Sequence, residues 1–194
     1  MNSIRKSSEK FANKAGNNLR ELTQRMHEVA ENQPFAQSLI NGNITNKEYA
    51  TYLFNQHPQY NLLETFSMLH GLLDVRIAPA IHADYQELWT EFEPNQPPLL
   101  PVVKEYMDHL LTIKDDPKKL MAHLYVRHMG DLSGGQIIKK KVPGSGRMYD
   151  FGDKVKEIKE VIRARCDDSM ADEANLCFDF ATKLFEQMSE LPKE

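Results

Sequence analysis

Apolar residues recur at three- to five-residue steps along most of this chain, which is the spacing of helices that bury one face. No stretch alternates apolar and polar residues for long enough to predict a β-strand. We therefore expect an all-α fold of seven or eight helices in a single domain over residues 1–194. The helices are expected at about residues 8–31, 34–40, 45–70, 77–92, 99–113, 117–141, 150–166 and 170–191.

Local signals predict several helix ends. Thr45 is followed three residues later by Glu48, which is the pattern of a capping box. Asp116 is a favourable N-cap because a proline follows it at the first helical position. We expect Ser169 to cap the last helix. Pro58 lies inside the third helix and must kink it or remove one of its hydrogen bonds.

Residues 125–136 place three glycines and an aspartate inside an otherwise helical run. Each glycine in a helix interior costs about 1 kcal/mol relative to alanine, so Gly130, Gly134 and Gly135 together cost about 3 kcal/mol. Two explanations are open: another helix packs closely against the bare backbone, or a flat ligand lies against it. Asp131 favours the ligand, because a packing notch has no use for a carboxylate.

Composition narrows the classes of function. The net charge is −4 and no basic block is present, so we expect no nucleic-acid partner. Apolar runs are only a few residues long, which argues against a transmembrane helix, and the N-terminus lacks the apolar core of a secretory signal. The two cysteines, Cys166 and Cys177, indicate neither a disulfide framework nor a thiolate metal site.

The glycine-bearing string resembles one known helix. Residues 130–136 read Gly-Asp-Leu-Ser-Gly-Gly-Gln, and this string is similar to the distal helix that lies over the haem plane in haem oxygenases. Residues 19–32 look like the proximal helix of that family, and residues 178–186 look like its last helix. The resemblance covers nearly the full chain. It implies an all-α fold with haem between a proximal helix and a glycine-kinked distal helix.

The resemblance places His27 at the position of the axial iron ligand. Taken alone, a histidine on a helix face is usually a surface or hydrogen-bonded residue. Glu31 is four residues further along the same face, where it could hold the imidazole. A single neutral histidine leaves the opposite side of the iron open for dioxygen. His128 takes a place where the family often has tyrosine, and we interpret it as a structural difference.

Cations and aromatic residues are assigned to the cofactor in the same way. Arg20, Lys159 and Arg163 would be a solvated basic face if taken alone, but the resemblance places them, with Tyr125, around the haem propionates. Aromatic residues spaced seven apart on one helix indicate core packing, which is compatible with a wall of the haem pocket. The resemblance implies haem contacts for Gly130, Ser133, Gly134, Phe178 and Phe185.

The resemblance groups three residues as catalytic. Arg127 precedes Asp131 by four residues, so the two could form an ordinary surface ion pair worth about 0.3–0.5 kcal/mol. The resemblance adds Tyr60 to the same polar cluster. In this interpretation Asp131 orders water molecules that deliver a proton during the reaction with dioxygen.

The implied activity is that of a haem-degrading oxidoreductase. Haem b would be both cofactor and substrate, and dioxygen and external electrons would convert it to biliverdin, with cleavage at the α-meso carbon, ferrous iron and carbon monoxide. A ferredoxin, a flavoprotein or another reductase would donate the electrons. We expect a soluble monomer without a membrane anchor, in the cytoplasm, or in a plastid stroma if a transit peptide has been removed.

Three other functions are compatible with a helical chain of this kind. A haem carrier or sensor could share the fold, but it would not need a proton relay at Asp131. A helical carboxylate metal enzyme needs paired Glu-x-x-His ligands, and the sequence contains no such pairs. A plain helical interaction domain would leave the glycine–aspartate string unexplained.

Overall fold

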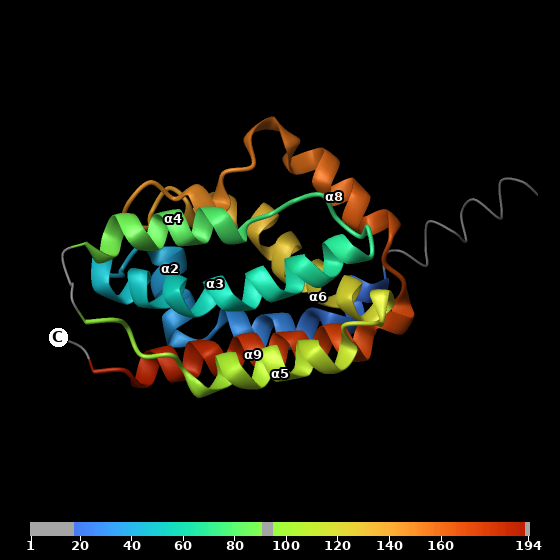
Figure 1. Ribbon diagram of the computed structural model, residues 1–194, viewed down its shortest axis with the longest axis horizontal. Helices are drawn as coiled ribbons and strands as arrows, with labels where there is room; N and C mark the ends of the chain where they lie inside the picture. Colours follow the sequence, from blue (N-terminus) through green and yellow to red (C-terminus); the bar gives the residue numbers. More distant parts are fainter. Residues whose placement is uncertain (1–17, 91–94, 193–194) are drawn as a thin grey trace, which may run out of the picture.

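All regular structure in the described part of the chain is helical (Figure 1). The computed structural model describes residues 18–90 and 95–192, and these contain no β-strand, which confirms the all-α prediction. A first helix occupies residues 18–31 of the described part. It is followed by α2 (Pro34–Asn41), α3 (Asn46–Leu69), α4 (Ala78–Trp89), α5 (Pro101–Ile113), α6 (Pro117–Ser133), α7 (Gly135–Ile138), α8 (Val155–Ala164) and α9 (Ala171–Glu190), with 3₁₀ turns at Arg147–Tyr149, Gly152–Lys154 and Asp168–Met170.

The helix ends follow the predicted chemistry with one exception. Thr45 accepts a hydrogen bond from the Glu48 backbone while the Glu48 carboxylate accepts one from the Thr45 backbone. Asp116 accepts from two backbone N–H groups in the first turn of α6. The predicted Ser169 cap is wrong: Asp167 accepts from the Ser169 backbone, and a 3₁₀ turn then leads into α9. The Ser169 hydroxyl also donates to Asp167, and no side chain caps the start of α9.

The sequence contains two possible helix breaks, at Pro58 and at the glycine string, and the structure differs between them. Helix α3 continues through Pro58, so the proline removes a backbone donor without ending the helix. The glycine-bearing segment, expected as one helix, instead divides at Gly134 into α6 and α7. Gly134 keeps helical dihedral angles, with φ −62° and ψ −34°. The side-chain amide of Gln136 donates to the backbone carbonyls of Asp131 (3.3 Å) and Tyr149 (3.0 Å), so it covers a carbonyl at the break.

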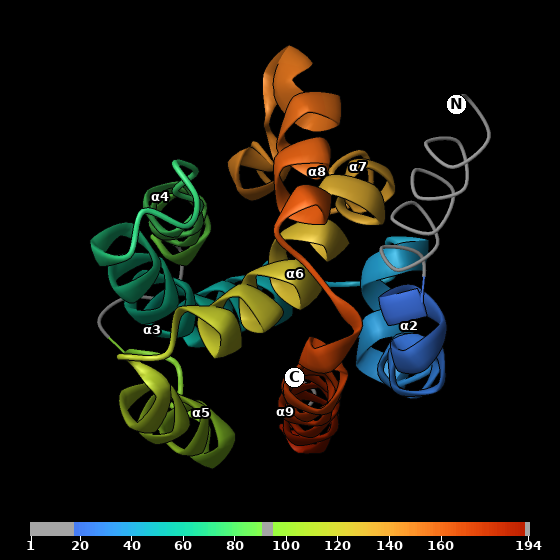
Figure 2. The same cartoon turned by 90° about the vertical axis from the view of Figure 1, so that its right-hand side faces the viewer.

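Helix α6 lies at the centre of the fold. Figure 2 shows it crossing the middle of the molecule between α8 and α9, and α3 and α5 also pack against it. Leu120 and Leu124 of α6 are fully buried there. Burying a leucine side chain stabilises a fold by about 1.5–3 kcal/mol relative to leaving it exposed. The helix that carries the glycine string is thus anchored by its apolar residues on the other turns.

Helix α9 joins the first helix to this centre. The Asn175 side chain donates to the backbone carbonyl of Leu22 (3.3 Å), and the ring of Phe178 meets the ring of His27 edge-on. Because α9 also packs on α6, the expected proximal and distal helices are held through a common neighbour. Within the described residues, no helix is both long and apolar enough to span a membrane.

Candidate functional site

His27 is presented at the surface of the first helix. Its side chain is 49% exposed, and its Nδ1 lies 3.8 Å from a carboxylate oxygen of Glu31. That distance is too long for a hydrogen bond, so Glu31 lies near the imidazole, as predicted, without fixing it. The Phe178 ring packs edge-on against the imidazole, with the ring centroids 5.6 Å apart. His27 makes no hydrogen bond within the described part of the chain, which leaves a ring nitrogen available as a ligand.

The three glycines of the string have different surroundings. A methyl group built on Gly130 would meet no atom within 4 Å, and one on Gly134 would meet only the Gly130 carbonyl oxygen at 3.6 Å. At Gly135 the same methyl group would lie 2.5 Å from the Tyr149 ring. Close packing therefore explains Gly135, whereas the protein itself does not require bare backbone at Gly130 and Gly134. Close packing, the first explanation left open by the sequence, applies to Gly135, and a ligand against the backbone stays a prediction for Gly130 and Gly134.

The exposed residues of the glycine-bearing segment have small side chains or none. Gly130, Ser133 and Gly134 are all exposed, and Ser133 and Gly134 come three and four residues after Gly130, so all three lie on one face at the end of α6. Asp131, adjacent in sequence, points to the other side and is only 8% exposed. One helical turn thus offers bare backbone on one side and a buried carboxyl on the other.

Asp131 is held by one strong hydrogen bond. The Tyr60 hydroxyl of α3 donates to its Oδ2 at 2.7 Å. The pKa of Asp131 is raised to about 7. Burial is the main cause and the negative charge of Glu64 adds to it, whereas the Tyr60 hydrogen bond and the positive charge of Arg127 oppose it. A carboxyl group with this pKa is partly protonated near neutral pH, which suits proton transfer.

Arg127 does not form the surface ion pair that was considered from the sequence. Its side chain is buried, and the three nitrogens of its guanidinium group donate to Tyr106 Oη (3.1 Å), Gln56 Oε1 (3.0 Å) and Gln59 Oε1 (2.7 Å). It also lies 5.4 Å from the centroid of the Tyr60 ring. The guanidinium group is committed to α3 and α5, so it influences Asp131 through its charge and not through a direct bond.

His128 fills a structural place, as interpreted from the sequence. It is fully buried, and its Nε2 lies 3.3 Å from a carboxylate oxygen of Glu64. Glu64 in turn accepts hydrogen bonds from the backbone N–H groups of Ile77 (2.6 Å) and Ala78 (3.1 Å) at the start of α4. The pair therefore ties α6 to the α3–α4 connection.

The predicted cations gather near one end of the first helix. Tyr125 of α6 is half-buried, and burial raises its pKa, while Thr23 and the positive charges of Arg20 and Arg163 lower it. These effects place Arg20 of the first helix and Arg163 of α8 within electrostatic reach of one tyrosine. Lys159 lies one turn before Arg163 on α8 and is half-buried.

The two aromatic residues of α9 that were predicted to contact haem lie in different surroundings. Phe178 is 9% exposed and lies against His27. Phe185 is half-buried two turns later, where its ring stacks on Phe35 (6.1 Å between centroids) and Tyr52 (6.3 Å). Phe178 is thus next to the expected iron ligand, whereas Phe185 belongs to an aromatic group between α2, α3 and α9.

Sequence reasoning missed the polar residues that hold Arg127. Gln56 and Gln59 lie on α3, and both are buried. Gln56 is four residues after Tyr52, and Gln59 is four residues before Leu63, so all four share one helix face. Two amide side chains on a face that also carries large apolar residues were the sign in the sequence that a buried polar partner is needed. Tyr106, the third partner, comes from α5 and carried no comparable signal.

The comparisons with known proteins agree with this arrangement. The family model described as "Heme oxygenase" matches residues 13–187. The chain is 31% identical to a heme oxygenase of Pyropia yezoensis, over 92% of this chain and 87% of that protein. It is 26% identical to heme oxygenase 2 of Macaca fascicularis over 89% of its own length, but spans only 64% of that relative. The structure of heme oxygenase 2 from Synechocystis, in complex with heme and NO, is 26% identical with a TM-score of 0.73, covering 91% of this chain and 85% of that one.

Proposed function

The chain belongs to the haem oxygenase family, and from that premise we propose how its own residues degrade haem to biliverdin, ferrous iron and carbon monoxide. Haem b is the substrate, and its iron, when bound, supplies the activation of dioxygen, with electrons from an external reductase. We extend this to a single domain over residues 1–194 that acts as a monomer. The protein's task is to hold the ring, keep one side of it accessible and deliver protons.

One observation carries the proposal: bare, exposed backbone and a buried, titratable carboxyl group occupy the same turn of α6. Gly130 and Gly134 leave space that the protein does not fill, and a flat macrocycle could lie against their main chain. Asp131 lies directly beside them with a pKa of about 7. A haem carrier has no use for such a proton donor, so this pairing favours an enzyme.

The proximal side fits haem as well. His27 is half-exposed and has a free ring nitrogen, so it can ligate the iron, and Phe178 limits the orientations of its ring. Glu31 lies close enough to accept from Nδ1 after a small side-chain movement. A neutral histidine here would hold the iron, and the space that Gly130 and Gly134 leave unfilled would be available to dioxygen.

The cations give the ring its orientation. Arg20 and Arg163 lie near Tyr125, with Lys159 one turn away, and this group can pair with two propionates. Pairing at that end determines which edge of the ring faces the α6 backbone. We propose cleavage at the α-meso carbon on this basis.

Proton delivery is assigned to Asp131, with Tyr60 and Arg127 as its supports. The Tyr60 hydroxyl orients the carboxyl group through Oδ2, and the buried charge of Arg127 keeps its pKa from rising further. A carboxyl group that is half-protonated near pH 7 can both give a proton to water and regain it. Asp131 therefore acts through ordered water and does not need to touch the ring.

The test is an absorption titration of the full chain with hemin, followed by ascorbate in air. The wild type should give a sharp Soret band that decays into the broad bands of biliverdin. Asp131→Ala should retain the Soret band but lose ring cleavage by about 100-fold or more, the range for a general acid or base. His27→Ala should change the Soret band itself.

Each outcome separates the assignments. Unchanged ring cleavage in Asp131→Ala would exclude its role, and an unaltered spectrum in His27→Ala would exclude His27 as the ligand. A stable Soret band in the wild type, with ascorbate and with a ferredoxin or flavoprotein reductase, would point to a carrier.

A further inference from the structure

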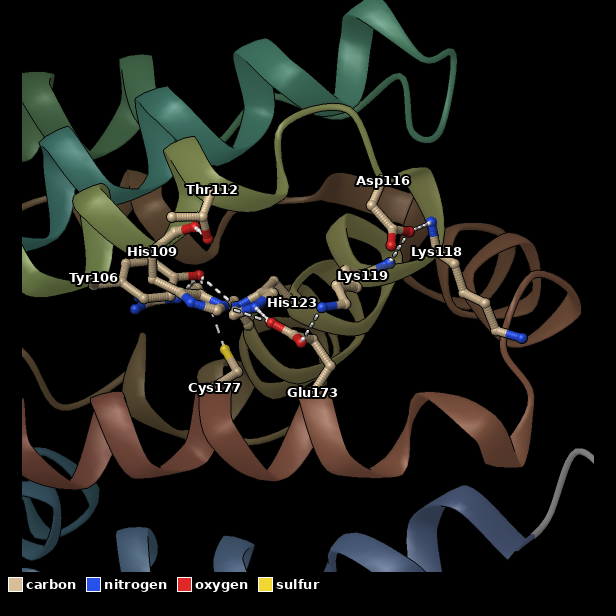
Figure 3. Close-up of polar contacts among 10 residues, drawn as sticks. Tyr106, His109, Thr112, Asp116, Lys118, Lys119, His123, Glu173 and Cys177 are labelled. Carbon is tan, nitrogen blue, oxygen red and sulfur yellow. Dashed lines mark hydrogen bonds and ion pairs between the residues drawn. The ribbon is translucent and has the colours of Figure 1, made fainter.

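Helices α5, α6 and α9 bring together His109, His123 and Glu173, none of which belongs to the proposed haem site (Figure 3). A carboxylate oxygen of Glu173 lies 2.5 Å from His109 Nε2 and 2.9 Å from His123 Nε2. One ligand atom from each residue lies within 4.8 Å of the other two. Two imidazoles and one carboxylate thus converge on one point from three separate helices.

We propose that these three side chains bind one divalent transition-metal ion of the Zn²⁺ class, independently of haem. Two histidines and a glutamate, with water in the remaining position, form a known type of zinc site. The same three ligand types also bind other borderline metal ions that favour imidazole nitrogen and carboxylate oxygen. The ligand atoms are close enough that small side-chain rotations would place all three around one ion.

The surroundings resemble a built site with an entrance. His123 is completely buried, whereas the His109 and Glu173 side chains are 20% and 13% exposed. An ion could enter beside His109 and Glu173, with His123 as the floor of the site. Most histidines at protein surfaces lack such a combination of depth and access.

A buried tyrosine supplies the outer support that metal-binding histidines usually have. Tyr106 Oη lies 2.9 Å from His123 Nδ1, so it can accept a hydrogen bond from Nδ1–H. His123 Nε2, which faces Glu173, can then bind metal after losing its own proton. The same hydroxyl accepts from Arg127 Nε (3.1 Å) and lies 3.9 Å from Cys177 Sγ, to which it can donate. Two accepted bonds and one donated bond satisfy a tyrosine hydroxyl completely.

Lys119 is the group that competes with an ion. Its Nζ lies 3.7 Å from the second carboxylate oxygen of Glu173, but its side chain is 49% exposed. An exposed lysine can turn into solvent at little cost, because such surface pairs are worth at most about 1 kcal/mol. Its charge therefore weakens metal binding without blocking the site.

The test uses the haem-free full chain titrated with Co²⁺, whose visible bands report the ligand geometry, followed by competition with Zn²⁺. We expect one Co²⁺ per chain, displaced by one Zn²⁺. His109→Gln and Glu173→Gln should each weaken binding at least about 10-fold, because each removes one ligand while keeping a similar shape. His70→Gln and His82→Gln are the matched controls and should bind as the wild type does. His70 Nε2 lies 2.8 Å from the Lys114 carbonyl oxygen, and His82 pairs with His57, with ring centroids 5.0 Å apart.

Three results would overturn the proposal: no saturable one-to-one binding, unchanged binding in both ligand variants, or loss of binding in either control. X-ray absorption of the Zn²⁺-loaded wild type gives a check that does not depend on any variant folding. It should show two imidazoles and oxygen ligands, and any sulfur ligand or a different number of imidazoles would refute the assignment. Because no haem is present, failure here leaves the proposed haem activity untouched.

Discussion

Asp131 and Glu173 are two sheltered carboxylates whose pKa values move in opposite directions. Burial raises the pKa of Asp131 to about 7. Glu173 is also desolvated, which opposes its ionisation, but hydrogen bonds from His123 and His109 lower its pKa to about 2. Hydrogen bonds link Glu173 through His123 and Tyr106 to Arg127. Arg127 lies 5.4 Å from the centroid of the Tyr60 ring, and Tyr60 is the residue that donates to Asp131.

The difference comes from how many donors each carboxylate receives. Asp131 receives one neutral hydroxyl, because the nearest cation, Arg127, donates to Gln56, Gln59 and Tyr106 instead. Glu173 receives two imidazole donors on one oxygen and lies 3.7 Å from Lys119 at the other. Burial sets the penalty for ionisation, and the placement of donors decides whether it is overcome. The first arrangement favours proton transfer, and the second favours a permanent anion.

The largest effect on stability should come from Asp131. Its pKa is about 7 in the folded chain against about 4 when unfolded. The folded state therefore holds the proton more tightly, and stability that is present below pH 4 is lost as the pH rises to 7, by up to about 4 kcal/mol. Asp131→Asn should remove this loss and make the haem-free protein more stable than the wild type at pH 8. Urea unfolding at pH 5 and pH 8 measures it.

Asp108→Asn is the control for that experiment, because Asp108 is exposed and pairs with Lys104 at the surface of α5. It should change stability by less than about 0.5 kcal/mol at either pH. If Asp131→Asn and wild type lose stability in parallel between pH 5 and pH 8, Asp131 is not desolvated in the way described.

The effect of Glu173 should have the opposite sign. Its pKa is lowered to about 2 in the folded chain from about 4.3 when unfolded, so it contributes stability above pH 4.3 that is lost as the pH falls toward 2. Glu173→Gln should cost up to about 3 kcal/mol at pH 7, and the cost should shrink below pH 4. Thermal unfolding at pH 7 and pH 3.5 tests this, with the exposed Glu186→Gln on the same helix as control. An equal cost at both pH values would show that the loss is steric.

Tyr106 should show how strongly the two groups are joined. Tyr106→Phe removes the acceptor for the buried Nε of Arg127 and the partner of His123, which should cost about 1–3 kcal/mol at pH 7. Tyr49→Phe is the matched control, because the buried Tyr49 hydroxyl makes no hydrogen bond within the described residues and its removal should cost almost nothing. Equal costs, measured by urea unfolding, would mean that the Tyr106 hydroxyl stabilises neither neighbour.

The smallest effect should come from Lys119. The lysine is half-exposed and 3.7 Å from Glu173, so Lys119→Ala should change the free energy of unfolding by less than about 0.5 kcal/mol. A loss similar to that of Glu173→Gln would mean that the lysine, and not the two imidazoles, keeps Glu173 ionised.

Local order was readable from the sequence. The Thr45 and Asp116 caps, the end of α2 at Gly42 and the all-α class all follow from interactions between residues a few positions apart. The family followed from the seven-residue string beginning at Gly130. Ser169 was the exception, because its backbone N–H and its hydroxyl both donate to the neighbouring Asp167.

Other features were decided only when distant segments packed together. The neighbouring sequence does not distinguish Gly135 from Gly134. The difference arises because the Tyr149 ring packs against Gly135. The residues near Arg127 in the sequence do not predict that its guanidinium group will donate to α3 and α5 and not to Asp131. Its partners Gln56 and Tyr106 lie 71 and 21 residues away along the chain. The grouping of His109, His123 and Glu173 is of the same kind, because each helix contributes one residue.

The sequence by itself determined where helices form, which turn carries glycine beside a carboxylate, and which family this pattern belongs to. The tertiary structure alone decided how deeply each ionisable group is buried and which donors reach it. The physical reason is the distance along the chain over which each interaction acts. Helix propensity and capping depend on neighbours within about one turn, whereas desolvation and hydrogen-bond partners depend on side chains that packing brings from elsewhere in the chain.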